Sequence, residues 1–155
     1  MGAKDDPGRA GGGRVKATPF LLFDGNCAEA MTFYQSCIGG ELTLTKLGDT
    51  PMKSSFPPDK HNRIINARLS AGAVDISATD WMASPALEPT LGNMSAVYLT
   101  SDRYDELKPV FDRLADGAGK DWFQDLHEMP FGFYGQFFDR YGVQWIFRAG
   151  GESLL

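Results

Sequence analysis

Few side chains in this 155-residue sequence are suited to acid–base chemistry. There are two histidines, His61 and His127, and His127 is followed directly by Glu128. An imidazole beside a carboxylate is a typical proton-transferring pair, because histidine titrates close to neutral pH. Adjacent side chains on a strand point to opposite faces, however, so an extended conformation would separate this pair. We expect both histidines to lie in or near loops, and the sequence leaves open whether the protein is an enzyme.

The two cysteines, Cys27 and Cys37, fall in one predicted helix, ten positions apart. Ten residues of helix separate them by about 15 Å, so they cannot form a disulfide with each other within that helix. Cys27 lies near the helix start, where a thiolate is favoured, but no histidine lies nearby in sequence to activate it. Reduced thiols fit a cytoplasmic protein, which is the localisation we expect.

Composition and charge limit the partners. The chain has 15 Lys and Arg against 20 Asp and Glu, a formal net charge of −5, and no dense basic run. This argues against nucleic acids and anionic membrane surfaces as partners. No apolar run approaches the roughly 20 residues of a membrane span, and the first residues lack the apolar core of a secretory signal. A small molecule or another protein is the partner that remains.

The elements that would position the chemical groups follow the same order in both halves. The first half predicts a strand, a helix, a strand, a polar loop with three prolines and a β-hairpin, at residues 20–23, 27–38, 41–47, 48–62 and 63–80. Asn26 and Glu29 form a capping-box pattern at the helix start, and Gly39–Gly40 ends the helix. The hairpin is expected to turn at Ala71–Gly72.

The second half predicts a strand, a helix, a strand and a hairpin around Gly142, at residues 94–100, 101–119, 120–129 and 133–147. Pro109 lies inside this helix, where we expect a bend. The two closing hairpins align at an offset of 70, which places Gly72 on Gly142. An internal duplication of a βαβββ unit accounts for this pattern.

The predicted fold class is therefore α+β, with two βαβββ modules. Its parts are a flexible tail, a first module, a linker, a second module and a C-terminal tail, at residues 1–16, 17–80, 81–92, 93–148 and 149–155.

Four segments carry a resemblance to a known family. They are "FLLFDGNCAEAMTFYQSCIGGEL", "INARLSAGAVDISATD", "GNMSAVYLTSD" and "FYGQFFDRYGVQWIF". In order and wording they resemble PhnB-like proteins, a branch of the vicinal oxygen chelate superfamily that includes glyoxalase I, bleomycin-resistance proteins and extradiol dioxygenases. The resemblance covers Thr18 to Phe147. It implies two modules whose mixed sheets curl into a cup around a cavity, usually in a homodimer.

This branch often carries a methyltransferase label. The sequence shows no Gly-rich strand-to-helix loop opening a parallel sheet, as a nucleotide-like cofactor would need.

The resemblance also implies where a metal would bind. Members that use a divalent metal place His or Glu at four strand positions, which fall here at Pro19, Ile76, Ser95 and Ile146. Proline and isoleucine cannot ligate a metal through their side chains, and serine rarely does. A register shift of one would bring in Asp75. We therefore expect no metal and no other cofactor.

The cup would then be lined by aromatic and polar side chains. Our candidate ligand-binding residues are Asn66, Arg68, Trp81, Trp122, Phe131, Tyr134 and Gln136. An apolar pocket with a few convergent polar groups is typical of small-molecule sites. Arg68 needs a partner on the sheet face, which would be Asp75 on the paired strand or a bound anion. Trp145 alternates with Val143 and Phe147 and is expected in the core.

Three functional hypotheses follow. The first is a metal-free protein, in a homodimer, that binds an aromatic or cationic small molecule. The second is an enzyme that uses acid–base chemistry, or a divalent metal held by unusual ligands such as Asp75 and His127. The third is an interaction module without a ligand.

Overall fold

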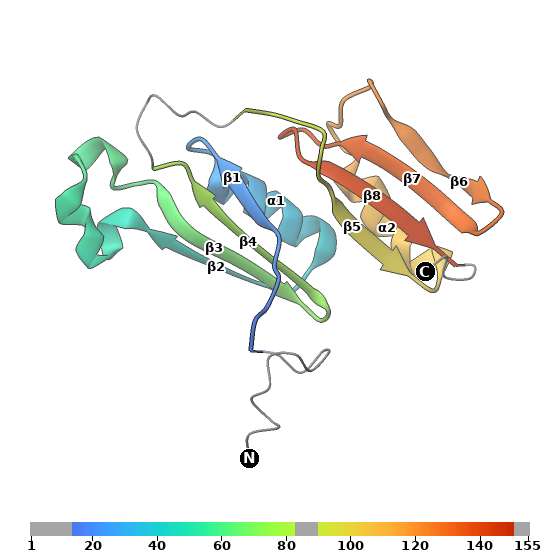
Figure 1. Cartoon of the computed structure of the whole chain (residues 1–155), viewed down its shortest axis with the longest axis horizontal. Helices are drawn as coiled ribbons and strands as arrows, with labels where there is room; N and C mark the ends of the chain where they lie inside the picture. The colour runs from blue at the N-terminus through green and yellow to red at the C-terminus, as the bar shows by residue number, and fades with distance from the viewer. Residues whose placement is uncertain (1–13, 83–89, 151–155) are drawn as a thin grey trace, which may run out of the picture.

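The computed structural model describes residues 14–82 and 90–150. It contains two four-stranded mixed sheets, with strand orders β1-β4-β3-β2 and β5-β8-β7-β6. Strand β1 pairs with β4, and β5 pairs with β8, in parallel. The other neighbouring strands pair antiparallel. Figure 1 shows the two sheets side by side, with one helix lying against each. Two βαβββ modules of an α+β fold, the class predicted from the sequence, are therefore present.

The first module follows the predicted order. Its elements are β1 Phe20–Phe23, α1 Cys27–Ile38, β2 Glu41–Lys46, β3 Ile64–Ala71 and β4 Val74–Asp80. The predicted loop between β2 and β3 contains three short 3-10 helices, η2 Leu47–Asp49, η3 Pro51–Ser55 and η4 Pro58–Lys60. Two of these begin with proline, whose fixed φ suits a first helical position. The prolines therefore order part of this connection.

The second module repeats the order. Its elements are β5 Val97–Ser101, α2 Tyr104–Leu114, β6 Gln124–Met129, β7 Gly132–Phe138 and β8 Gln144–Ala149. Pro109 lies inside α2 as predicted. The last strand extends two residues beyond the predicted hairpin, and the backbone N–H of Gly150 donates to the carbonyl of Ser101. This extension places Arg148 within β8.

The two closing hairpins have turns of different length, so the predicted alignment of the hairpins at a constant offset of 70 does not hold beyond the turns. The β3–β4 turn consists of Gly72 and Ala73, one residue later than predicted, whereas the β7–β8 turn spans residues 139–143. The two loops differ in length by an odd number of residues. After the turn, residues that are 70 positions apart therefore point to opposite faces of their sheets. Ile76 is therefore buried against the helix layer, while Ile146 faces the other side of its sheet.

One hydrophobic core lies between the helices and the sheets. Trp145 is fully buried in it, as predicted, and packs edge-on against Tyr34 of α1 at 5.2 Å between ring centroids. Phe111 of α2 contacts Phe137 and Phe147 in the same way. Because Tyr34 and Trp145 come from different modules, the core is continuous between them.

Candidate functional site

Each sheet has one face covered by its helix and one face without a helix, which we call the open face. The registers place Arg68, Ser77 and Phe20 on the open face of the first sheet. On the second sheet Tyr134 lies beside Arg148. Polar and exposed apolar side chains therefore share the open face, and it is the natural place to look for a binding site.

Four of the seven candidate residues lie on this open face. Asn66 and Arg68 come from β3, and Tyr134 and Gln136 come from β7. The structure thus brings these four to the same side of the molecule, although on two different sheets. Their role in binding stays a prediction.

The other three candidates lie at the ends of strands. Trp81 follows β4, and its backbone carbonyl accepts a hydrogen bond from Arg63 at 2.9 Å. Trp122 lies in the loop before β6, with a positive φ of 64° and 74% of its surface exposed. Phe131 lies in the β6–β7 turn, 6.3 Å from the ring of Tyr134. Phe131 therefore lies beside another candidate residue.

Arg68 has its partner within the protein. Its Nε and Nη2 donate to the two carboxylate oxygens of Asp75 at 2.9 and 3.1 Å, and Lys16 lies 3.7 Å from the same carboxylate. The hydrogen bonds from Arg68 lower the pKa of Asp75, and those to Asp75 raise the pKa of Arg68. Of the two partners predicted for Arg68, Asp75 is the one that it contacts in the structure.

A second arginine on the open face is bonded differently. Arg148 donates from Nε to the Tyr98 hydroxyl at 3.1 Å and from Nη1 to the Gly150 carbonyl at 3.2 Å. Both acceptors are uncharged. Arg148 was not among the candidate residues because it follows the last predicted strand. The alternation of Gln144, Ile146 and Arg148 is the signal that would have extended the strand.

A hollow lies between β1 and β5. Its volume is about 530 Å³. It is lined by residues of β1, of the segment before β5 and of the β7–β8 turn, namely Pro19, Phe20, Leu21, Leu22, Thr90, Leu91, Gly92, Ser95, Ala96, Val97, Gly142, Val143 and Gln144. None of the seven candidate residues is among them. This hollow was not predicted from the sequence.

Two of the four implied metal positions, Pro19 and Ser95, fall on the wall of this hollow. Ile146 lies on the open face next to Gln136 and Tyr98, and Ile76 is buried on the opposite face. These side chains cannot hold a divalent ion together. Across residues 14–82 and 90–150, no three His, Cys, Asp or Glu side chains are grouped as metal ligands. The residues present therefore do not fit the metal site of the superfamily.

The alternative ligands Asp75 and His127 lie on different sheets, in β4 and β6. His127 lies on the open face beside Tyr134, whereas Glu128 pairs with Phe133 on the opposite face. The two neighbours point apart, as expected for a strand, and do not form an acid–base pair. His127 lies within β6, inside the strand predicted at residues 120–129, and two residues before the end of β6 at Met129.

His61 fixes the connection between β2 and β3. Its Nε2 lies 2.9 Å from the carbonyl oxygen of Lys53 and 3.1 Å from that of Phe56. Because both neighbours are acceptors, Nε2 must carry the proton and donate. His61 therefore has a structural role in this segment.

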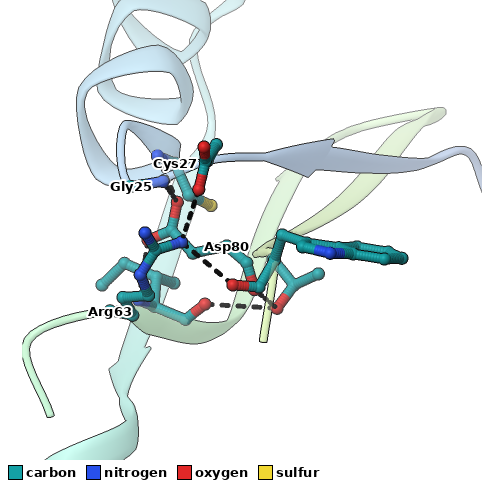
Figure 2. A network of polar contacts seen from close by, with 8 residues as sticks. Gly25, Cys27, Arg63 and Asp80 are labelled. Atoms are coloured by element: carbon teal, nitrogen blue, oxygen red, sulfur yellow. Dashed lines mark hydrogen bonds and ion pairs between the residues drawn. The ribbon is translucent and has the colours of Figure 1, made fainter. Parts of the chain in front are cut away.

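A buried carboxylate closes the start of α1. Asp80, 1% exposed, accepts hydrogen bonds at Oδ1 from the backbone N–H groups of Gly25 and Cys27, and at Oδ2 from that of Ile64 (Figure 2). The predicted Asn26 cap is absent, since Asn26 makes no side-chain capping bond. A helix N-terminus can bind a phosphate or other anion, but the protein's own side chain fills this one. Asp80 thus takes up the backbone donors at this helix start.

Asp80 also affects the neighbouring thiol. Burial, together with the nearby carboxylate, raises the pKa of Cys27 to about 12. Cys37 is buried as well, and burial raises its pKa. Both thiols are therefore protonated at neutral pH and enclosed, which does not suit a nucleophile.

A second buried carboxylate joins the modules. Asp139 accepts from the backbone N–H groups of Tyr141 and Val143 at Oδ1, and from the Trp145 indole and the Tyr34 hydroxyl at Oδ2. Burial and this carboxylate raise the pKa of Tyr34 far above its usual range, so its phenol remains a donor. The bond between Tyr34 and Asp139 holds α1 of the first module against the hairpin turn of the second.

With this geometry in place, the chain can be compared with known proteins. The family model described as 3-demethylubiquinone-9 3-methyltransferase matches residues 15–147. The chain belongs to this family. Its fold is also that of a PhnB protein and of a glyoxylase/bleomycin resistance protein/dioxygenase domain, the groups that its sequence motifs resemble.

Three solved structures illustrate the likeness. Protein PA1353 from Pseudomonas aeruginosa is 29% identical, with a TM-score of 0.75 over 89% of this chain and 99% of that one. A PhnB protein from Bacillus cereus is 24% identical, with a TM-score of 0.65 over 88% and 100%. A glyoxylase/bleomycin resistance protein/dioxygenase domain from Frankia sp. EAN1pec is 15% identical, with a TM-score of 0.59 over 90% and 94%. The last two show the shared fold.

Within the described residues, no helix is both long and apolar enough to cross a membrane.

Proposed function

We propose that this PhnB-like protein binds a small, largely apolar or aromatic molecule in the hollow between β1 and β5, without a metal. The observation that carries the proposal is the hollow itself. Its volume of about 530 Å³ lies within the roughly 300–1,000 Å³ typical of ligand sites. It lies on the wall where metal-dependent relatives would carry ligands, but Pro19 and Ser95 stand there instead. The same position in the fold therefore offers a binding surface without metal chemistry.

The lining supports a ligand that is mostly apolar with one or two polar groups. Phe20 is 54% exposed and Leu22 is 45% exposed, and both contribute to the wall. The Gln144 amide nitrogen, placed by its hydrogen-bonding partners, lies 3.0 Å from the Ser95 carbonyl and 3.3 Å from that of Asn93. Its amide oxygen then remains as an acceptor. A ligand that covers the apolar wall and donates one hydrogen bond to Gln144 fits this site.

Two variants test the location. Ala96 is an exposed residue on the wall, and Ala96→Phe should fill the hollow. Thr32→Phe adds the same side chain at an exposed position of α1 and serves as the matched control. A thermal-shift screen of aromatic antibiotics and α-keto acids, followed by calorimetry, should yield a ligand that stabilises the native protein. Ala96→Phe should weaken its binding at least about tenfold, while Thr32→Phe leaves it unchanged.

The outcomes separate the hypotheses. Unchanged binding in Ala96→Phe would place the ligand elsewhere on the molecule. No shift with any compound would favour an interaction module that has no ligand. A stoichiometric divalent ion that survives dialysis of the purified protein would overturn the metal-free part of the proposal and favour the metal-dependent enzyme.

We also propose that two copies form a homodimer. The exposed side chains of Phe20 and Leu22 stand at the rim of the hollow, where a second copy would cover apolar surface and enclose the ligand. Light scattering coupled to gel filtration should give twice the mass of one chain. A monomer at all concentrations would contradict this assembly and leave the ligand test unaffected.

Methyl transfer is not proposed, although the matched family model is named after it. The turn between β1 and α1 is closed by Asp80, whose carboxylate takes the N–H groups of Gly25 and Cys27 that could otherwise bind an anionic cofactor group.

A further inference from the structure

The guanidinium of Arg148 has hydrogen-bonding capacity that the described residues do not use. An arginine side chain carries five N–H donors. Arg148 uses Nε for the Tyr98 hydroxyl and Nη1 for the Gly150 carbonyl, and Nη2 has no acceptor among residues 14–82 and 90–150. No carboxylate in that part of the chain forms an ion pair with it. A half-buried cation with neutral neighbours has free donors and uncompensated charge.

The side chains around Arg148 are also donors. Tyr98 uses its oxygen to accept from Arg148, so its hydroxyl hydrogen is available. The Tyr134 hydroxyl donates to Oε1 of Gln136, which leaves the Gln136 amide nitrogen free to donate. Donors gathered around one cation match an oxyanion.

The sheet register places these groups together. Tyr134 pairs with Arg148, which pairs with Thr100, and Gln136 pairs with Ile146, which pairs with Tyr98. All of these side chains share the open face of the second sheet. Ile146 lies between Gln136 and Tyr98 and provides an apolar floor. The arrangement is a shallow polar site with one cation and a hydrophobic base.

We propose that Arg148, Tyr98 and Gln136 form a subsite for an oxyanion, the carboxylate or phosphate group of a small molecule. The planar guanidinium can donate two parallel hydrogen bonds to such a group, which an ammonium cannot. The subsite extends the proposed function but does not depend on it. Gln144 of the hollow and Arg148 face the same side of β8, four residues or about 13 Å apart, so one elongated organic anion can reach both.

The first sheet provides a matched control. Arg68 also lies on the open face, but its Nε and Nη2 already donate to the two carboxylate oxygens of Asp75, at 2.9 and 3.1 Å. An anion would have to displace an attached carboxylate there. Only Arg148 should therefore respond to added anions, and Arg68→Gln removes the same charge without removing the subsite.

Inorganic phosphate and acetate are the probes, measured by calorimetry and by thermal shift at constant ionic strength set with sodium chloride. Wild-type protein should bind at least one of the two anions and gain stability as its concentration rises. Arg148→Gln should weaken binding at least about tenfold, and Arg148→Lys by several fold, because lysine keeps the charge but not the fork. Arg68→Gln should bind as wild type does. A preference for phosphate or for acetate identifies whether the subsite binds a phosphate or a carboxylate group.

Three outcomes would overturn the subsite. One is the absence of any binding beyond the sodium chloride control. Another is equal loss of binding in Arg148→Gln and Arg68→Gln, which would indicate a general charge effect. The third is a dimer that dissociates in Arg148→Gln while phosphate has no effect, which would assign the guanidinium to a second copy. Ala96→Phe should retain phosphate binding, so failure of the hollow and failure of the subsite are distinguishable.

Discussion

Charged side chains have different surroundings on the helix-covered side and on the open face of the two sheets. On the covered side Asp80 and Asp139 are 1% and 4% exposed, and every carboxylate oxygen accepts at least one hydrogen bond from the protein. On the open face Arg68 is held by a solvent-exposed carboxylate, and Arg148 contacts only neutral oxygens. The covered side therefore stabilises the fold, and the open face is where we propose that an anion binds.

Removing the charge of Asp139 should have the largest effect on stability. In Asp139→Asn the amide oxygen can still accept from the backbone N–H groups of Tyr141 and Val143. The amide nitrogen then faces two donors, the Tyr34 hydroxyl and the Trp145 indole. Leaving these buried donors unsatisfied should cost about 3 kcal/mol in the free energy of unfolding, measured by urea denaturation.

Two further variants control this measurement. Tyr34→Phe removes one donor but leaves the carboxylate with three partners, so it should cost about 1–2 kcal/mol. Asp59→Asn, at an exposed position, should cause no measurable change. If Asp139→Asn were as mild as Asp59→Asn, the bond between the modules would not contribute to stability.

Asp80→Asn should have a smaller effect, because fewer donors lose their acceptor. The amide oxygen can keep the N–H groups of Gly25 and Cys27, and only the N–H of Ile64 then faces a donor. We expect a loss of about 2 kcal/mol, again from urea denaturation. A loss larger than that of Asp139→Asn would reverse the ranking that the hydrogen-bond geometry predicts.

Cys27 provides a pH-dependent test of how closed the covered side is. The folded pKa of about 12 lies above the ordinary value of 9.0, so the native state keeps the proton longer. This contribution to stability is complete below pH 9 and is lost as the pH rises toward 12. At pH 10 the unfolding free energy should have fallen by about 1.4 kcal/mol more than in Cys27→Ala.

The measurement compares urea denaturation of wild type and Cys27→Ala at pH 8 and pH 10. A disulfide reagent at pH 8 adds an independent readout, since both thiols should react only after unfolding. Rapid modification of the native protein would show that the covered side opens. Identical pH dependence in the two proteins would show that the thiol is solvated.

The sequence predicted the elements well because apolar periodicity follows burial. Trp145 was assigned to the core from its alternation with Val143 and Phe147, and it is fully buried. The two buried aspartates were not recognised. Asp80 and Asp139 stand at strand ends, where aspartate usually belongs to a turn, and their partners lie up to 105 residues away. Long-range acceptors of this kind leave no local pattern.

The site was predicted less well, for a similar reason. The face that Asn66, Arg68 and Gln136 share follows from strand alternation. Part of the wall of the hollow comes from segments outside the strands, Thr90–Gly92 and the turn at Gly142, whose approach depends on how the modules pack. The choice of Arg68 over Arg148 depended on where the last strand ends, and strand ends are weakly encoded.

The ion pair between Arg68 and Asp75 should have the smallest effect, which would sharpen the contrast between the two sides. Both groups are open to water, and exposed pairs contribute little. Arg68 lowers the pKa of Asp75, so any stabilisation exists above the ordinary value of 3.8 and is lost as the pH falls through the folded pKa. A double-mutant cycle with Arg68→Gln and Asp75→Asn should give a coupling at pH 7 well below the cost of Asp80→Asn. The coupling should disappear at pH 2. A coupling as large as the Asp80 effect, or one that persists in acid, would mean that this part of the open face is enclosed in solution and would remove Arg68 as a control for Arg148.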